Sequence, residues 1–445
     1  MHQFTRLADG HKKGVYLRPM PDSAAARTQM FRKRSHPLEG IAREKLKITD
    51  VRATLIGYTF PPGDFLWMGS TYVVWRADAC VVQVFTDQGV AGMGEGSPYA
   101  GAEAMKKFIE TYARPALIGK NPFDVEHLAC PWAGPASSPL MRWIGSLPWA
   151  AVDMALWDII GKTKNLPVYE LLATEVPAKP RVPVYASGGT KWAWYKRPED
   201  VIDEAIQAKE EKFRAFKFRI GTEWKNNAVT MPQYITLLRR MREAVGPDFK
   251  LIQEGNMRFS LEEALDLCPV LEELNFLWFE EPVDSWQEGS VEAHLKIKEA
   301  LPHVLVSGGE LLANRFEFAQ WAHRGAFDIV QPDCNMMGLT EAWHTAMLAH
   351  AQRKYCCPHA WHNGFTIMAN AHLAAAIPNL LLLEYFHTYN PLKEEIFVDP
   401  ARVKDGFLEL PTRPGFGMEL IPDLEKKFPF EPGNWRRPNP DLPEA

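Results

Sequence analysis

Long apolar runs are missing from this sequence of 445 residues. The most apolar stretch, residues 373–386, is interrupted by Pro378 and Asn379, whereas a membrane-spanning helix needs about 20 consecutive apolar residues. The first 14 residues also lack the apolar core of a secretory signal peptide. We therefore expect a protein that does not cross a membrane and that works in the cytoplasm.

An excess of basic charge is absent as well. The 50 lysines and arginines face 55 aspartates and glutamates, a net charge of −5, which offers no basic surplus for wrapping nucleic acid. The six cysteines show no paired spacing, so free thiols in a reducing compartment are expected rather than a disulfide framework. An apolar fraction of 46% is ordinary for a globular protein.

The chain changes character along its length. Residues 1–45 are polar and lean basic without periodicity, which is typical of an extension that forms either an arm over a neighbouring subunit or a mobile tail. Residues 46–180 contain a strand pattern, a hairpin pattern around Thr86–Gly89, and two helical patterns over 102–119 and 147–165. These patterns predict the first part of an α+β domain.

Residues 181–385 repeat a strand followed by a helix. Eight such units predict a (β/α)₈ barrel, since an open doubly wound sheet would need a glycine-rich phosphate turn after an early strand and none is present. Residues 386–445 return to short strands and turns, and we expect them to complete the domain begun by residues 46–180.

Three glutamates end consecutive strand patterns of the predicted barrel. They are Glu254 in LIQEGN, Glu280 in FLWFEEP and Glu310 in VLVSGGE, spaced by 26 and 30 residues, about one strand-helix unit. Carboxylates at the same end of parallel strands point into a shared pocket, where they repel one another unless a cation lies among them. Three hard oxygen ligands without a nearby cysteine favour Mg²⁺ over zinc.

The second strand, AFKFRIG, alternates between apolar and basic residues. Side chains alternate across a strand, so packing Phe216 and Phe218 against the outer helices directs Lys217 and Arg219 into the barrel. Two cations there are costly unless anions face them, and the three glutamates or a substrate carboxylate supply those anions.

The remaining strand ends also carry polar groups. Asn256 can add an amide to the metal or substrate shell, and Asp333 ends strand six, one unit before His359 at the end of strand seven. A carboxylate bonded to an imidazole fixes its tautomer and makes it a general base, with His362 as the rival imidazole. Glu384 ends strand eight, where it can bond a developing oxyanion if protonated or orient a substrate hydroxyl. Together with magnesium and an inward lysine, these groups suit abstraction of the proton α to a carboxylate.

The motifs GMGEGSP, AVDMALWDIIGK, KFR, QEGN, FEEP, SGGE, QPD and PH, in this order over residues 47–425, resemble the enolase superfamily and its mandelate racemase-like branch. The resemblance implies a modified (β/α)₈ barrel under an α+β capping domain built from both termini, and an even-numbered homo-oligomer. It also implies that cap loops around Tyr58–Trp75 select the substrate. It assigns the following roles: Glu254, Glu280 and Glu310 as Mg²⁺ ligands, Asp333–His359 as the base, Lys217 and Glu384 as catalytic partners, and Arg219, Asn256 and His362 as substrate contacts.

Two positions depart from that family's pattern. Its strand-three ligand is usually aspartate, so the longer Glu254 leaves open whether this side chain binds the metal directly. Its second basic residue on strand two is usually a lysine that acts as a base, whereas Arg219 is a poor base and a good carboxylate or hydroxyl clamp.

A racemase needs a base on each face of the α-carbon, but a dehydratase works with one. His359 would take the α-proton and then, as the imidazolium, protonate the departing β-hydroxyl. The sequence therefore favours a sugar-acid dehydratase that forms a 2-keto-3-deoxy sugar acid. The alternatives are a racemase or epimerase that uses Lys217 opposite His359, and a non-catalytic barrel that binds a sugar acid.

Overall fold

The computed structural model describes residues 32–69, 71–96, 101–128, 146–220, 228–361 and 363–439. The chain divides into two compact units, residues 1–32 and 33–445, and the fold described below is that of the second unit. No helix in these ranges is both long enough and apolar enough to cross a membrane.

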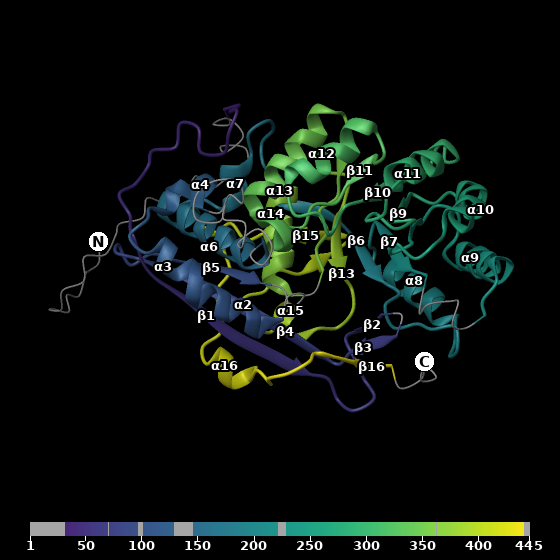
Figure 1. Ribbon diagram of the computed structural model, residues 1–445, viewed down its shortest axis with the longest axis horizontal. Coiled ribbons are helices and arrows are strands. Elements are labelled where there is room, and N and C mark those ends of the chain that lie inside the picture. The colour runs from purple at the N-terminus through teal and green to yellow at the C-terminus, as the bar shows by residue number, and fades with distance from the viewer. Residues whose placement is uncertain are drawn as a thin grey trace, which may run out of the picture. The chain divides into compact units, whose positions relative to one another are not determined.

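A parallel barrel is the larger part of this unit's strand structure (Figure 1). Its eight parallel strands, all in the described ranges, are β6 (Arg181–Gly188), β7 (Ala215–Arg219), β8 (Lys250–Glu254), β9 (Trp278–Glu280), β10 (Leu305–Gly308), β11 (Ile329–Val330), β12 (Tyr355–Cys356) and β13 (Leu383–Phe386). Strands β6 to β12 pair in chain order, β13 pairs with β6, and a bridge between Cys356 and Leu380 closes the remaining gap. The predicted (β/α)₈ barrel is confirmed.

The floor of the barrel is apolar. Tyr185, Ala215, Ile252, Trp278 and Ile329 form one buried cluster, with Tyr185 and Trp278 packed edge to face. Ala215, Ile252 and Trp278 lie four, two and two positions before the strand ends Arg219, Glu254 and Glu280, so the side chains at those three ends point to the same inner side. The alternation of each strand thus places an apolar layer beneath a polar mouth.

Helices follow the strands and lie outside the barrel (Figure 1). They are α8 (Asp200–Glu210), α9 (Met231–Val245), α10 (Leu261–Glu273), α11 (Ser290–Glu299), α12 (Arg315–Arg324), α13 (Cys334–Ala351) and α14 (Gly364–Ala376). Capping boxes start two of them, with Thr230 and Gln233 at α9 and Ser260 and Glu263 at α10. These local signals set where each helix begins after its strand.

The capping domain is built on a three-stranded antiparallel sheet in the order β1 (Ile48–Thr59), β4 (Arg76–Thr86), β5 (Ala91–Gly96). Helix α6 (Ser146–Lys164) packs against β5 so closely that a Cβ at Gly94 would lie 2.0 Å from the carbonyl oxygen of Ala151. Helix α6 also contacts α13 of the barrel. It is therefore buried along most of its length, as a helix between two layers must be.

The helix predicted over residues 102–119 is interrupted. It consists of α2 (Ala102–Phe108), a π-helical turn η2 (Ile109–Ala113) and α3 (Arg114–Leu117). The other short helices are η3 (Pro122–Asp124), α4 (Val125–Leu128), α7 (Val168–Leu172), α15 (Pro391–Glu394) and α16 (Leu424–Lys427). A π-turn adds one residue to a helical turn and shifts the buried face, which the apolar periodicity alone did not predict.

The C-terminal segment pairs with strands of both the barrel and the capping domain. Strands β14 (Val403–Lys404) and β15 (Phe407–Glu409) form a hairpin that pairs with the start of β6. Strand β16 (Arg436–Pro438) pairs with β3 (Tyr72–Val74), which in turn pairs with β2 (Trp67–Met68). Both ends of the chain therefore contribute to the capping domain, while the exact boundaries at residues 46, 181 and 386 stay predictions.

The described part of the N-terminal extension packs on its own chain. The guanidinium of Arg34 donates to the carbonyl oxygens of Leu171 at 2.7 Å and Ala173 at 2.9 Å, at the end of α7. Further along, Arg43 pairs with Asp124. Residues 33–46 are thus attached to the capping domain, and an arm that reaches a neighbouring subunit stays a prediction for the residues before them.

Candidate active site at the barrel mouth

Three carboxylates meet at the mouth of the barrel. Glu254 ends β8, Glu280 ends β9 beside it, and Glu310 follows β10 by two residues. One oxygen from each lies within 4.8 Å of the other two. Burial, with the charges of Glu254 and Glu280, raises the pKa of Glu310 to about 7 against the opposing effect of His359. Carboxylates that repel one another in this way, with only oxygen donors among them, fit a hard cation such as Mg²⁺.

Lys217 lies beside these carboxylates. Its ammonium contacts the Glu280 carboxylate, Glu384 Oε1 at 2.9 Å and Glu254 Oε2 at 3.5 Å. Burial alone would lower the pKa of Lys217, but the carboxylates of Glu254, Glu280 and Glu384 raise it well above its usual value. The side chain is therefore a fixed positive charge, which suits stabilisation of an anion better than removal of a proton.

Asp333 and His359 form a hydrogen-bonded pair. Asp333 is the N-cap residue of α13, and its Oδ2 accepts from Nδ1 of His359 at 2.8 Å. Its other oxygen accepts from the backbone N–H of Asn335 and from Nδ2 of Asn370. With Nδ1 donating to Asp333, Nε2 lies on the opposite side of the ring, 3.3 Å from Oε2 of Glu310. The ring is thus oriented by one nitrogen and presents the other to the mouth.

Glu384 connects the lysine to the histidine loop. Its Oε2 accepts from the backbone N–H of Ala360, and its Oε1 pairs with Lys217. Against the effect of its burial, Lys217 and His359 lower the pKa of Glu384 to about 2. The ionised form favours the role of accepting a substrate hydroxyl over that of donating to an oxyanion.

Arg219 lies at the end of β7 between two tryptophans. Its guanidinium carbon is 5.3 Å from the ring centroid of Trp67 on β2 and 5.4 Å from that of Trp361, after β12. Arg219 also donates to the carbonyl oxygen of Met68 at 3.5 Å. A strand of the capping domain therefore contacts the barrel mouth through this arginine.

Of the other two predicted substrate contacts, the structure describes Asn256 but not His362. Asn256 lies in the loop after β8 with a φ of 46°, two residues past Glu254. Gly255 before it has no room for a side chain, because a Cβ would lie 2.7 Å from the carbonyl oxygen of Glu281. His362 lies outside the described residues.

A second link joins the capping domain to the histidine loop. Nδ2 of Asn363 donates to Oε1 of Glu95 on β5 at 2.6 Å and to the carbonyl oxygen of Asp78 on β4. Asn363 precedes α14 and lies four residues after His359. Burial raises the pKa of Glu95 to about 7. The position of the loop that carries the imidazole thus depends on the capping sheet.

Sequence reasoning missed several residues of this site. Glu281 is buried beside Glu280, and burial together with Glu310 raises its pKa well above its usual value. Gln331 donates to Oε2 of Glu280 at 2.8 Å, and Trp278 donates to the same oxygen at 3.0 Å. The sequence could have indicated Glu281, as the second glutamate of FEEP, and Gln331, as the first residue of QPD. No sequence pattern indicated Asn370, which lies in the middle of α14 and donates to Asp333.

The fold and the site together describe one class of protein. Its members have a parallel barrel with acidic groups at the ends of consecutive strands, and a capping domain formed by the N- and C-terminal parts of the chain covers the barrel. Two family models match this chain: the enolase C-terminal domain-like model over residues 200–424, and the N-terminal domain of mandelate racemase / muconate lactonizing enzyme over residues 68–173. The chain belongs to the mandelate racemase-like branch of the enolase superfamily.

Individual relatives agree with this placement. The chain is 31% identical over 342 residues to an arabinonate dehydratase of Saccharolobus solfataricus, covering 76% of this chain and 87% of that protein. It is 28% identical over 392 residues to a D-galactarolactone cycloisomerase of Agrobacterium fabrum, covering 86% and 99%. A mandelate racemase/muconate lactonizing protein from Paracoccus denitrificans PD1222, solved with magnesium, matches with a TM-score of 0.72 at 27% identity over 86% of this chain and 98% of that one.

Proposed function

We propose that this protein is a Mg²⁺-dependent dehydratase of a sugar acid, an aldonate or an aldarate, and forms a 2-keto-3-deoxy sugar acid. The observation that carries the proposal is the oriented imidazole of His359 at a mouth where Lys217 is already paired with carboxylates and residue 219 is arginine. Among the residues that the structure describes at the mouth, His359 is the side chain to which we assign proton exchange with the α-carbon. The dehydratase name of the relative from Saccharolobus supports this reaction.

The metal site is proposed to consist of Glu254, Glu280 and Glu310, whose oxygens already converge. Mg²⁺ bound there would supply positive charge next to the substrate carboxylate and so make the α-proton more acidic. Lys217 adds a fixed positive charge on the same side, within reach of two of the three glutamates. Negative charge that develops on the substrate carboxylate is thereby stabilised without moving a proton.

Proton transfer is assigned to the dyad. Nε2 of His359 takes the α-proton while Asp333 holds the proton on Nδ1 and stabilises the imidazolium. The imidazolium then returns a proton to the β-hydroxyl, the Cβ–O bond breaks, and water leaves. The resulting enol becomes the 2-keto acid by taking up a proton at the β-carbon and releasing the proton of its hydroxyl to solvent. Glu384 and Arg219 are proposed to hold a substrate hydroxyl and a carboxylate or hydroxyl, respectively.

Cycloisomerisation is a second candidate, favoured by the relative from Agrobacterium, which the alignment covers over 99% of its length. It would begin with the same proton abstraction but would not release water. Racemisation or epimerisation is less well supported by the geometry. It requires a second base, and Lys217 is held as an ammonium by three carboxylates.

The test is a library of sugar acids and sugar-acid lactones incubated with the protein and Mg²⁺ in deuterated water. Formation of a 2-keto product from one configuration series would support dehydration. Deuterium in recovered substrate without keto product would overturn it in favour of racemisation or epimerisation, and a lactone-derived product without water loss would favour cycloisomerisation. His359→Asn should abolish both signals, whereas His350→Asn, at an exposed position of α13, should leave both unchanged.

A further inference from the structure

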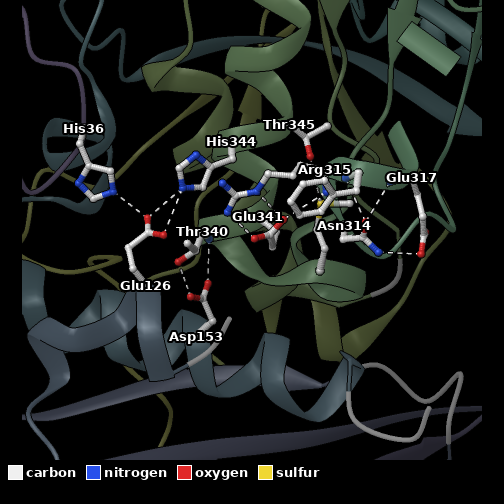
Figure 2. Close-up of polar contacts among 12 residues, drawn as sticks. His36, Glu126, Asp153, Asn314, Arg315, Glu317, Thr340, Glu341, His344 and Thr345 are labelled. Atoms are coloured by element: carbon white, nitrogen blue, oxygen red, sulfur yellow. Dashed lines mark hydrogen bonds and ion pairs between the residues drawn. The ribbon is translucent and has the colours of Figure 1, made fainter. Parts of the chain in front are cut away.

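Figure 2 shows a second group of potential ligands, which shares no residue with the three carboxylates at the barrel mouth. His36 comes from the N-terminal extension, Glu126 from α4 and His344 from α13. Nε2 of His36 lies 2.7 Å from Oε1 of Glu126, and Nε2 of His344 lies 3.0 Å from the same oxygen and 3.2 Å from Oε2. One ligand atom from each residue lies within 4.8 Å of the other two.

Glu126 is the anionic member of this group. Against partial burial, His344 and His36 lower the pKa of Glu126 to about 2, so its carboxylate is ionised at any working pH. Across the described ranges, the ion-pair partners of Glu126 are these two histidines, and no lysine or arginine joins them. Each of the three side chains is 21–37% exposed, so a metal ion and a water molecule have access.

We propose that His36, Glu126 and His344 form a binding site for a borderline transition-metal ion, Zn²⁺ or a close relative, distinct from the magnesium ligands at the barrel mouth. Two imidazole nitrogens and a carboxylate oxygen suit Zn²⁺, Ni²⁺ or Cu²⁺, whereas Mg²⁺ prefers oxygen ligands only. Three protein ligands leave a fourth tetrahedral position for water.

The nitrogen–oxygen distances at Glu126 are close to those between two ligands of one metal ion. Ligands about 2.1 Å from a tetrahedral zinc ion are about 3.4 Å apart, so the nitrogen–oxygen distances at Glu126 must lengthen by a few tenths of an ångström. The backbone N–H of Leu38 donates to Nδ1 of His36 at 3.1 Å, which places the proton of the neutral ring on Nε2. Metal binding at Nε2 moves that proton to Nδ1 and breaks the contact with Leu38. The turn at residues 36–38 therefore changes conformation when metal binds.

The site would connect three parts of the second unit. The extension carries His36, the capping domain carries Glu126 on α4, and α13 with His344 is the barrel helix whose N-cap is Asp333. A metal ion bound to all three would link the extension to both layers. Since an ion that binds the folded chain alone stabilises it by mass action, occupancy should raise the unfolding temperature without a requirement for turnover.

The experiment uses the full chain, stripped of metal and then given Zn²⁺ with a large excess of Mg²⁺ to occupy the carboxylate site. Bound zinc per chain is measured after dialysis, affinity is measured by competition with a chelating dye, and Co²⁺ replaces zinc for visible spectroscopy of imidazole ligation. We expect one zinc ion per chain. His344→Ala and Glu126→Gln should each weaken binding by at least the 10–100-fold typical of lost metal-site partners.

The controls separate this site from the barrel mouth and from loss of folding. His350→Ala, an exposed histidine on the same helix, should bind zinc as the unchanged chain does. His344→Gln keeps a side chain that can donate to Glu126, so it should fold normally and still lose zinc. The proposal is overturned if zinc remains bound in the His36→Ala, His344→Ala double variant, if Glu310→Gln removes it instead, or if the unchanged chain binds none. None of these readouts depends on the sugar-acid reaction.

Discussion

Asp153 offers the sharpest test of how the capping domain holds the barrel. It lies on α6, is 1% exposed, and accepts hydrogen bonds from the hydroxyl and the backbone N–H of Thr340 (Figure 2). Thr340 follows Gly338, where α13 is kinked with a φ of 80°, and a Cβ at Gly338 would lie 2.9 Å from Oδ2 of Asp153. Burial, opposed by the two bonds from Thr340, raises the pKa of Asp153 to about 7.

The contribution of Asp153 to the free energy of unfolding follows from its two pKa values, in the unfolded and in the folded chain. The ordinary value is 3.8 and the value in the folded chain is about 7, and each whole step in pKa is worth about 1.4 kcal/mol. Because the folded state holds the proton more tightly, the contribution to stability is complete below about pH 4 and is lost as the pH rises through about 7. The folded protein should therefore lose about 4 kcal/mol at this residue over that range.

Asp153→Asn imitates the protonated side chain at every pH, since its amide can donate to the Thr340 hydroxyl while its oxygen accepts from the backbone. We expect the variant to be about as stable as the unchanged chain below about pH 4 and more stable by up to about 4 kcal/mol near pH 8. Urea unfolding at several pH values, followed by circular dichroism, measures the difference. Asp266→Asn, at an exposed position of α10, is the matched control. Parallel pH profiles for the unchanged chain and Asp153→Asn would refute the reasoning.

Three further outcomes are expected. Arg34→Ala removes the hydrogen bonds to carbonyl oxygens at the end of α7 and should lower the free energy of unfolding by about 1–3 kcal/mol, whereas Lys33→Ala, with a side chain 70% exposed, should change it by less than about 0.5. An equal effect of both in a thermal melt would contradict this. Arg219→Lys keeps the charge but loses the planar group between two tryptophan rings, so steady-state kinetics should show a KM raised by at least about tenfold with a smaller change in kcat. A fall in kcat alone would place Arg219 in the chemical step. Removal of Mg²⁺ with a chelator should lower the unfolding temperature because the mouth carboxylates repel one another, and Glu310→Gln should reduce that shift, which scanning fluorimetry measures.

The barrel was predictable because its signals are local. Alternation in AFKFRIG was enough to assign the faces of Lys217 and Phe216, and in the structure Lys217 contacts the mouth carboxylates while Phe216 is buried on the other side. The strand-end glutamates were predictable from spacing, since parallel strands bring equivalent positions together. The roles of these residues in a reaction stay predictions.

What the sequence could not predict depends on long-range contacts. The group of His36, Glu126 and His344 unites positions 90 and 218 residues apart, and no periodicity encodes such proximity. The pKa of Asp153 depends on burial between two layers, which a single helix pattern does not reveal. The π-turn in residues 109–113 obeys no apolar period, so a continuous helix was the natural expectation there.

The pairing of β16 with β3 has a consequence for biosynthesis. Strand β3 and the neighbouring Trp67, which stacks on Arg219, leave the ribosome about 360 residues before the strand that completes their sheet. Domains usually fold as they emerge, but this mouth acquires its full cover only after residues 436–438 have been made. A nascent or truncated chain can thus contain every proposed catalytic side chain and still present an open barrel. Ribosome-bound chains arrested before and after residue 436 would differ in access to the mouth rather than in the barrel itself.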